Sequence, residues 1–135
     1  MFKYQRLVLL VLVTVGSCSH NDAFVYHPKP GVEVRVVVFN TESHETNNQK
    51  WIALNFDFEI RNDNREPLFF KVDSIEVNYN NVDSRKVYHR SFASVLAMRD
   101  SIIGSKRYEL YAVLPATTES KSLKRFEVTN FGFVK

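Results

Sequence analysis

WIALNFDFEIR, residues 51–61, is the stretch that decides the fold. Its large apolar side chains fall on one parity, as the set Ile52, Leu54, Phe56, Phe58 and Ile60. The other parity carries Trp51, Ala53, Asn55, Asp57, Glu59 and Arg61. A strict two-residue period over this length predicts a strand with one face in a core and the other in water. Each inward side chain contributes roughly 1.5–3 kcal/mol on full burial, so we expect this strand at the centre of a sheet.

Four other segments also have the pattern of strands. Val32–Phe39 and Lys106–Leu114 alternate without interruption, whereas Leu68–Tyr79 changes phase at Asp73-Ser74, which predicts a bulge. Ser122–Val134 reads as a last strand with a second phase change. Six or seven strands in about 110 residues, joined by hairpin-length links, favour an all-β fold: an antiparallel β-sandwich of the immunoglobulin or fibronectin kind.

The segments between these strands are less uniform. Asn40–Lys50 is polar throughout and predicts a surface loop, and Asn62–Pro67 has the composition of a turn. For residues 86–104 we expect a strand around Val87–His89, followed by a loop or a brief helix capped by Ser91. The alternative for this region is a strand over Lys86–Met98.

Length and charge narrow the class of protein. The chain has 135 residues, 44% of them hydrophobic, which is typical of one domain with a packed core. The formal charge of +3 includes Lys3 and Arg6, and without them the chain has 16 basic and 15 acidic residues. A nearly neutral domain gives no electrostatic reason to expect nucleic acid as a partner.

The amino terminus has the organisation of an exported precursor. Lys3 and Arg6 precede the apolar run Leu7–Val15, and small residues follow it. As a helix this run would span about 14 Å, whereas the hydrocarbon core of a bilayer is about 30 Å thick. We therefore expect a cleaved signal peptide and no transmembrane anchor.

Val15-Gly16-Ser17-Cys18 resembles the bacterial lipobox, in which an aliphatic residue and two small ones precede an invariant cysteine. The resemblance implies diacylglyceryl transfer to the Cys18 thiol, cleavage before Cys18 and acylation of the new amino terminus. The family more often has Leu at the first position and Ala or Ser at the second. In the alternative, ordinary signal peptidase cuts after Ser17, and Cys18, the only cysteine, is an incidental free thiol.

This interpretation divides the chain into a signal peptide (1–17), a lipidated cysteine with its tether (18–31) and a β-sandwich (32–135). Pairing of Phe24–Tyr26 with the edge of the domain would shorten the tether to a few residues. Ser19, and not Asp, follows the cysteine. In lipoprotein sorting this resembles an outer-membrane destination more than retention in the inner membrane.

Residues 62–81, NDNREPLFFKVDSIEVNYNN, carry a second resemblance. They are similar to the water-stress and hypersensitive-response (LEA14-type) domains, with matching positions at Asn62, Asn64, Pro67, Leu68, Val72 and Ile75. The glycine that such domains place after this strand is missing. The resemblance implies an immunoglobulin-like sandwich and carries no catalytic residues.

No motif for catalysis or metal binding is present in the sequence. There is no G-x-S-x-G, the glycines are isolated, and one cysteine cannot form a cysteine zinc site. His44-Glu45 lacks the second histidine of a zinc helix. Asp57, Glu59 and Asp63 suggest calcium, but Arg61 lies among them, so we expect ion pairs on a solvated face. We therefore predict no catalytic residue, no metal, no cofactor and no enzymatic activity.

Two functions remain open at this point. The first is a structural or protein-interaction module, held to the membrane by its lipid and docked on an envelope protein. The alternative is a ligand-binding module for a sugar, a peptide or a lipid that uses Trp51 and the Asn40–Lys50 segment. Trp51 and Tyr79 are the candidate residues for a ligand or partner surface.

Overall fold

The structure, a computed structural model, describes residues 22–90, 99–118, 123 and 125–134. In these residues it contains strands and no helix, which confirms the all-β prediction. The strands are β1 (Asp22–Lys29), β2 (Val32–Thr46), β3 (Gln49–Asn62), β4 (Leu68–Tyr79), β5 (Val82–Asp83), β6 (Lys86–His89), β7 (Asp100–Ile102), β8 (Gly104–Pro115) and β9 (Phe126–Val134).

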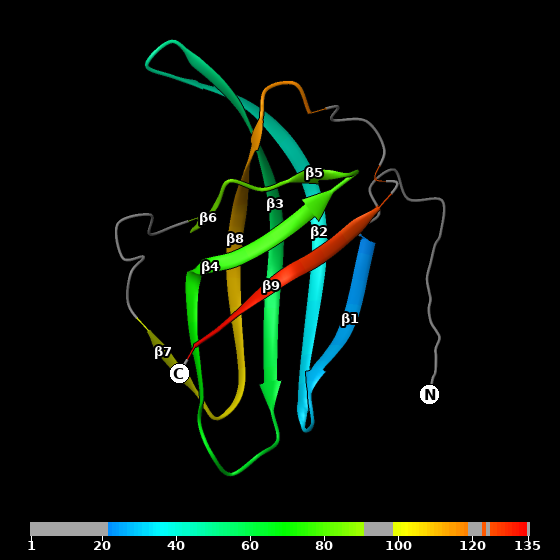
Figure 1. Cartoon of the computed structure of the whole chain (residues 1–135), viewed down its shortest axis with the longest axis vertical. Coiled ribbons are helices and arrows are strands. Elements are labelled where there is room, and N and C mark those ends of the chain that lie inside the picture. The colour runs from blue at the N-terminus through cyan, green and yellow to red at the C-terminus, as the bar shows by residue number, and fades with distance from the viewer. Residues whose placement is uncertain (1–21, 91–98, 119–122, 124, 135) are drawn as a thin grey trace.

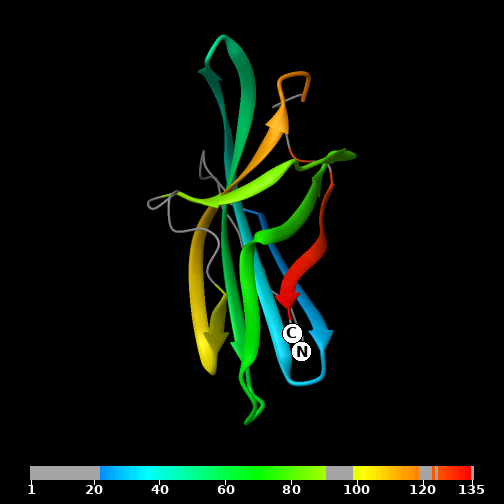
Figure 2. The same ribbon diagram turned by 60° about the vertical axis from the view of Figure 1, so that its left-hand side comes forward.

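The strands form two antiparallel sheets. The first has five strands in the order β1-β2-β3-β8-β6, and the second has β4 at its centre, paired with β5, β7 and β9. β3 is therefore the middle strand of the larger sheet, as predicted from residues 51–61. Figures 1 and 2 show β4 and β9 crossing in front of β2 and β3, so the two sheets stack as the layers of a sandwich.

Aromatic rings from both sheets meet in the core. Phe56 and Phe58 of β3 and Phe70 of β4 are fully buried. Phe58 stacks on Phe70 with ring centroids 5.6 Å apart, and Phe56 contacts Phe126 of β9 at 6.3 Å. Because each ring removes a large apolar area from water, these contacts are the main attraction between the layers.

β4 has the bulge that its sequence predicts. Its pairing with β9 shifts register between Phe70 and Ile75, and the buried parity changes with it. Gly132 of β9 lies opposite this irregularity with φ of +81°, and a Cβ there would be 2.7 Å from the carbonyl oxygen of Lys71. The two backbones approach too closely at this point for any residue larger than glycine.

The prediction of a surface loop at Asn40–Lys50 is wrong. β2 continues to Thr46 and β3 begins at Gln49, and the two are joined by a two-residue turn at Asn47 and Asn48, with φ of 52° and 63°. Positive φ at both positions is the geometry of a type I′ hairpin turn, which asparagine tolerates. Residues 40–50 thus form a β-ribbon, called the ribbon below, that rises beyond the sandwich (Figure 1).

A bulge at Phe39 sets the orientation of the ribbon. Val38 pairs with Phe56 and Asn40 pairs with Asn55, so Phe39 is an extra residue in β2. Before the bulge the even-numbered residues of β2 face the core, and after it the odd-numbered ones lie on that side of the strand. His44 lies opposite Trp51 of β3, so both side chains are on the face that points away from the core.

The segment predicted as a tether belongs in part to the domain. β1 pairs with β2 from Asp22 opposite Val38 to Lys29 opposite Val32. Phe24 and Tyr26 of β1 also pack on rings of β9. The boundary at residue 32 was therefore placed too late, and of residues 18–31 only 18–21 precede the first strand.

β6 confirms the strand predicted around Val87–His89. The brief helix after it, and the alternative strand over Lys86–Met98, depend on residues 91–98, which lie outside the described residues. The signal peptide and Cys18 lie outside them as well. The part of the chain that the structure describes contains no helix with the length and hydropathy needed to cross a bilayer.

Asn62 and Asn64 shape the connection between β3 and β4. Asn62 is 3% exposed, and its Nδ2 donates to the carbonyl oxygens of Glu66 at 2.9 Å and Ile102 at 3.0 Å. Its Oδ1 accepts from the amide of Asn64 at 3.0 Å. Two residues of the 62–81 pattern thus have a structural role, because a buried amide must have its hydrogen bonds made.

Candidate interaction surface

The outer face of the five-stranded sheet, which points away from the second sheet, divides into two regions. Near the ribbon it carries aromatic rings from β2, β3, β8 and β6 together with the polar residues Asn40, Glu42 and Asn55. Toward the opposite end it carries charges. The charged set is Glu33, Arg35, Asp57, Glu59, Arg61, Arg107 and Glu109.

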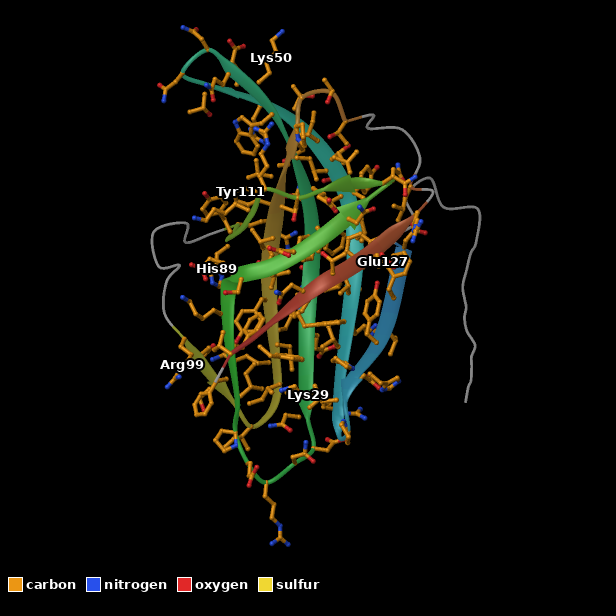
Figure 3. All side chains as sticks on the ribbon, in the orientation of Figure 1. Lys29, Lys50, His89, Arg99, Tyr111 and Glu127 are labelled. Carbon is orange, nitrogen blue, oxygen red and sulfur yellow. The ribbon has the colours of Figure 1, made fainter. Side chains whose placement is uncertain are left out.

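An aromatic row crosses four neighbouring strands of this face. His44 stacks on Trp51 with centroids 4.6 Å apart, and Trp51 stacks on Tyr111 at 6.0 Å. Tyr111 then contacts Tyr88 of the edge strand β6 at 5.5 Å. In Figure 3, Tyr111 lies below Lys50, which marks the ribbon, so the row lies at the base of the ribbon.

The rings of the row cover one another. Trp51 has the ring of His44 on one side and that of Tyr111 on the other, and its Nε1 donates to Thr46 Oγ1 at 3.2 Å. Ala53, which the sequence places on the outward parity, is only 2% exposed. The indole thus already stacks on two neighbouring rings, and the row stiffens the base of the ribbon.

A buried carboxylate lies in the charged region. Asp57 is 7% exposed and accepts from Arg90 Nη2 at 2.6 Å and from Arg107 Nη2 at 2.6 Å. The hydrogen bond to Asp57 is the main reason that the pKa of Arg107 is raised above its usual value. Asp57 thus ties β3 to β8 and to the residue that follows β6.

The ion pairs on this face differ in part from the prediction. Arg61 pairs with Asp63 at 3.5 Å, as expected, and with Glu33 at 3.9 Å, but it leaves Asp57 to the other two arginines. Within residues 22–90, 99–118, 123 and 125–134, no three histidine, cysteine or acidic side chains gather as metal ligands would. The calcium interpretation therefore gains no support.

A shallow hollow of about 370 Å³ adjoins the aromatic row. It opens at the base of the ribbon, and polar and apolar groups line it in nearly equal measure. The lining residues are Ser43, His44, Glu45, Lys50, Trp51, Ile52 and Ala116. Two hollows of about 400 and 530 Å³ lie at the opposite end of the domain, beside the turn between β1 and β2.

Trp51 and Tyr79, the two aromatic residues proposed from the sequence for a contact surface, lie in different environments. Trp51 is half-buried on the outer face. Tyr79 is 3% exposed and belongs to the core, so it is not available to a partner. The pKa of Tyr79 is raised, first by burial and then by the charge of Asp22. Tyr79 shares the parity of Ile75 and Val77, so the alternation of its strand was the available signal that it faces the core.

An apolar patch beside Asp22 was not recognised in the sequence. We call it the anchor-side patch. It consists of Ala23 and Val25 of β1 and Val37 and Phe39 of β2 on the outer face. Val25 is 54% exposed and Phe39 37% exposed, and Arg90 lies over the Phe39 ring at 5.4 Å. The alternation of Ala23 and Val25 with the inward Phe24 and Tyr26 was the available signal.

Comparisons of the chain with protein-family models, with curated proteins and with solved structures found no match.

Proposed function

We propose that this chain is a lipid-anchored protein of the bacterial cell envelope that acts, without catalysis, as a protein-interaction module. The anchor is supported by the sequence, because Cys18 is the only cysteine and follows a signal-peptide pattern directly. Two or three acyl chains hold a protein firmly, whereas one chain gives only marginal membrane binding.

The ribbon is the observation that carries the interaction role. Apart from Thr41 its residues are exposed, so it adds almost nothing to the core. Yet Asn40–Thr46 stay paired with β3 in continuous register, from Asn40 opposite Asn55 to Thr46 opposite Gln49. An ordered, polar projection of this kind is suited to contact with another molecule and not to stabilising the sandwich.

The outer edge of β2 along the ribbon is the part that would receive a partner. β1 covers this edge only as far as Val38, and among the described residues no strand pairs with it from Phe39 to Thr46. A free strand edge presents unpaired N–H and C=O groups, to which an extended segment of another protein adds as a further strand. We therefore propose strand addition by an envelope protein.

The anchor is tested by the intact mass of the protein purified from its native membrane fraction. We expect residues 18–135 plus two or three acyl chains. The variant Cys18→Ser should accumulate as an uncleaved or mislocalised precursor. An unmodified mass, or a Cys18→Ser protein that is still processed and still fractionates with the membrane, would contradict the anchor.

The interaction is tested by a photo-crosslinking amino acid placed at Ser43 in the ribbon. The control position is Arg65, which is also exposed but lies in the turn between β3 and β4. We expect a defined adduct in intact envelopes from Ser43 and none from Arg65.

A shortened ribbon is the second control for this experiment. Deletion of Glu45, Thr46, Gln49 and Lys50 removes two residues from each strand, so the turn and the orientation of the remaining side chains are kept. We expect the Ser43 adduct to disappear in this variant. An adduct that forms equally well from Arg65, or that survives the deletion, would refute the role of the ribbon.

The hollow beside Trp51 supports a second candidate, a ligand-binding module. Glu45 and Lys50 bring both signs of charge to its wall, and the indole already stacks on two neighbouring rings. A short peptide that carries charged groups is thus the better ligand class. Trp51 is the only tryptophan, so a saturable change of its emission on titration with peptides would support this candidate.

A further inference from the structure

The short chain between Cys18 and β1 limits which surface of the domain can face the membrane. We propose that the outer face of the five-stranded sheet lies against the lipid bilayer, with the anchor-side patch among the headgroups. The inference rests on the proposed lipid anchor at Cys18, and it adds the surface through which the folded domain itself contacts the membrane.

The first step is the length of the connection. Three residues, 19–21, lie between the acylated Cys18 and Asp22, the first residue of β1, so the two are four residue steps apart. A chain spans at most 3.3–3.6 Å per residue, so Cys18 lies no more than about 14 Å from Asp22. The bilayer surface must therefore pass within this distance of the upper end of β1.

The two ends of the domain are too far away to face the membrane. Asp22 pairs with Val38. At the rise per residue of a β-strand, the turn after Lys29 lies about 20 Å from Asp22 along the sheet. The tip of the ribbon at Asn47 lies about 25 Å from Asp22 in the opposite direction by the same measure. A domain standing on either end would need a connection longer than the one available.

The far surface of the second sheet and the β6 edge both lie farther from the anchor than the outer face does. Packed sheets lie about 10 Å apart, and outward side chains add about 5 Å, which places the far surface about 15 Å from the sheet of β1. The edge strand β6 is four strands from β1, or about 19 Å. The outer face, by contrast, begins at β1 itself, because Ala23 and Val25 project from it.

The exposed apolar residues near Asp22 agree with this placement, and the charges beside them, such as Arg35 and Glu59, restrict the contact to the headgroup layer. Val25, Phe39 and Ile103 are the large hydrophobic residues exposed in the described part of the chain, and the first two lie in the anchor-side patch. The aromatic row lies on the same face, and tryptophan and tyrosine favour the interface between lipid and water. An apolar patch next to an acylation site gains free energy when both contact the same bilayer.

This placement also sets the direction of the proposed strand addition. The ribbon continues the plane of the sheet, so its free β2 edge would run along the membrane surface. A partner strand would then approach in the plane of the bilayer, which fits a second membrane-bound protein.

The test uses the acylated protein reconstituted in vesicles of phosphatidylethanolamine and phosphatidylglycerol. A fraction of lipid with a nitroxide on its headgroup serves as the quencher. Trp51, the only tryptophan, reports from the outer face. The matched reporter is Phe69→Trp combined with Trp51→Phe, because Phe69 lies on β4 and points away from the core.

We expect the nitroxide to quench Trp51 at least twofold more than the reporter at position 69. Val25→Ser should reduce the quenching of Trp51. Ile103→Ser should not, because Ile103, which is 68% exposed, lies outside the anchor-side patch. Equal quenching of the two reporters in an acylated protein would overturn the inference and leave the anchor intact. A mass without acyl chains would overturn the anchor and the inference together.

Discussion

Arg90 Nη2 lies 2.6 Å from Asp57 Oδ1, so the residue that follows the edge strand β6 is joined across β8 to the central strand β3. Only 10% of the Asp57 side chain and 26% of the Arg90 side chain are exposed. This hydrogen bond is therefore shielded from water more than the other ion pairs of the outer face.

Asp57→Ala should lower the free energy of unfolding by about 2 kcal/mol, because removal of one partner leaves a partly buried arginine without its acceptor. Urea denaturation measures the change. Glu59→Ala, two residues along on the same face, is the control and should change stability by less than about 0.5 kcal/mol. Equal changes of unfolding free energy in the two variants would show that the buried ion pair of Asp57 contributes no more to stability than an exposed carboxylate does.

Gly132 and Gly104 form a matched pair for testing the close approach of β4 and β9. Both have positive φ, but a Cβ at Gly132 would lie 2.7 Å from the Lys71 oxygen, whereas a Cβ at Gly104 meets nothing within 4 Å. Gly104→Ala should cost about 1–2 kcal/mol of unfolding free energy from backbone strain alone. Gly132→Ala should cost more than this, and equal costs in urea denaturation would contradict the clash.

Asp100 should make the stability depend on pH. Burial alone raises its pKa, but hydrogen bonds from Lys106 and from Tyr108 outweigh burial and hold the pKa below its usual 3.8. The stabilisation is therefore complete above that value and is lost as the pH falls through the lower pKa of the folded state.

Asp100→Asn removes this contribution. At neutral pH it should lower the free energy of unfolding by about 1 kcal/mol, since the Tyr108 hydroxyl loses a charged acceptor. The difference in unfolding free energy between the variant and the wild type should shrink when the pH falls below the usual pKa of 3.8. Urea denaturation at neutral pH and below that value measures it. A difference that stays constant with pH would contradict the role of the carboxylate.

The ribbon should open independently of the sandwich. Asn48 has φ of 63°, which a β-branched residue tolerates poorly. Asn48→Val should therefore speed hydrogen exchange of amides in the ribbon while exchange in β3 beyond Trp51 stays unchanged. Asn48→Gly, which suits a type I′ turn, should leave the ribbon exchange as slow as in the wild type or slow it further. Uniform acceleration across β3 in the valine variant would refute this independence.

The strands of the sandwich could be predicted from the sequence wherever one face of a strand is buried in the core. Residues 51–61 alternate strictly, and the structure places their apolar parity in the core. The phase change at Asp73-Ser74 predicts the bulge for the same reason, because burial forces the side chains back toward the core.

The ribbon could not be predicted from hydrophobic alternation because both of its faces are exposed to water. Residues 40–50 need no apolar alternation when backbone pairing and the turn at Asn47-Asn48 hold them together. A polar strand and a polar loop then have the same composition. The consecutive asparagines Asn47 and Asn48 were the one local signal of a hairpin turn.

The contacts of the outer face depend on register across strands that are distant in sequence. Asp57 and Arg107 are fifty residues apart, and nothing local in the sequence favours Arg107 over the nearer Arg61 as the partner of this carboxylate. Tyr79 differs from this case, because its alternation with Ile75 and Val77 places it in the core from the local sequence alone.

The extra residue at Phe39 lets β2 keep its pairing with β3 on both sides of one irregular position. Deletion of Phe39 would place Asn40 directly after Val38, so Asn40 would still lie opposite Asn55 and His44 opposite Trp51. The two faces of the ribbon would therefore stay as they are, and the deletion would remove only the bulge and one exposed aromatic ring. We expect β2 to accept the loss of one residue at this position, whereas the same loss elsewhere in the strand would turn core side chains toward water.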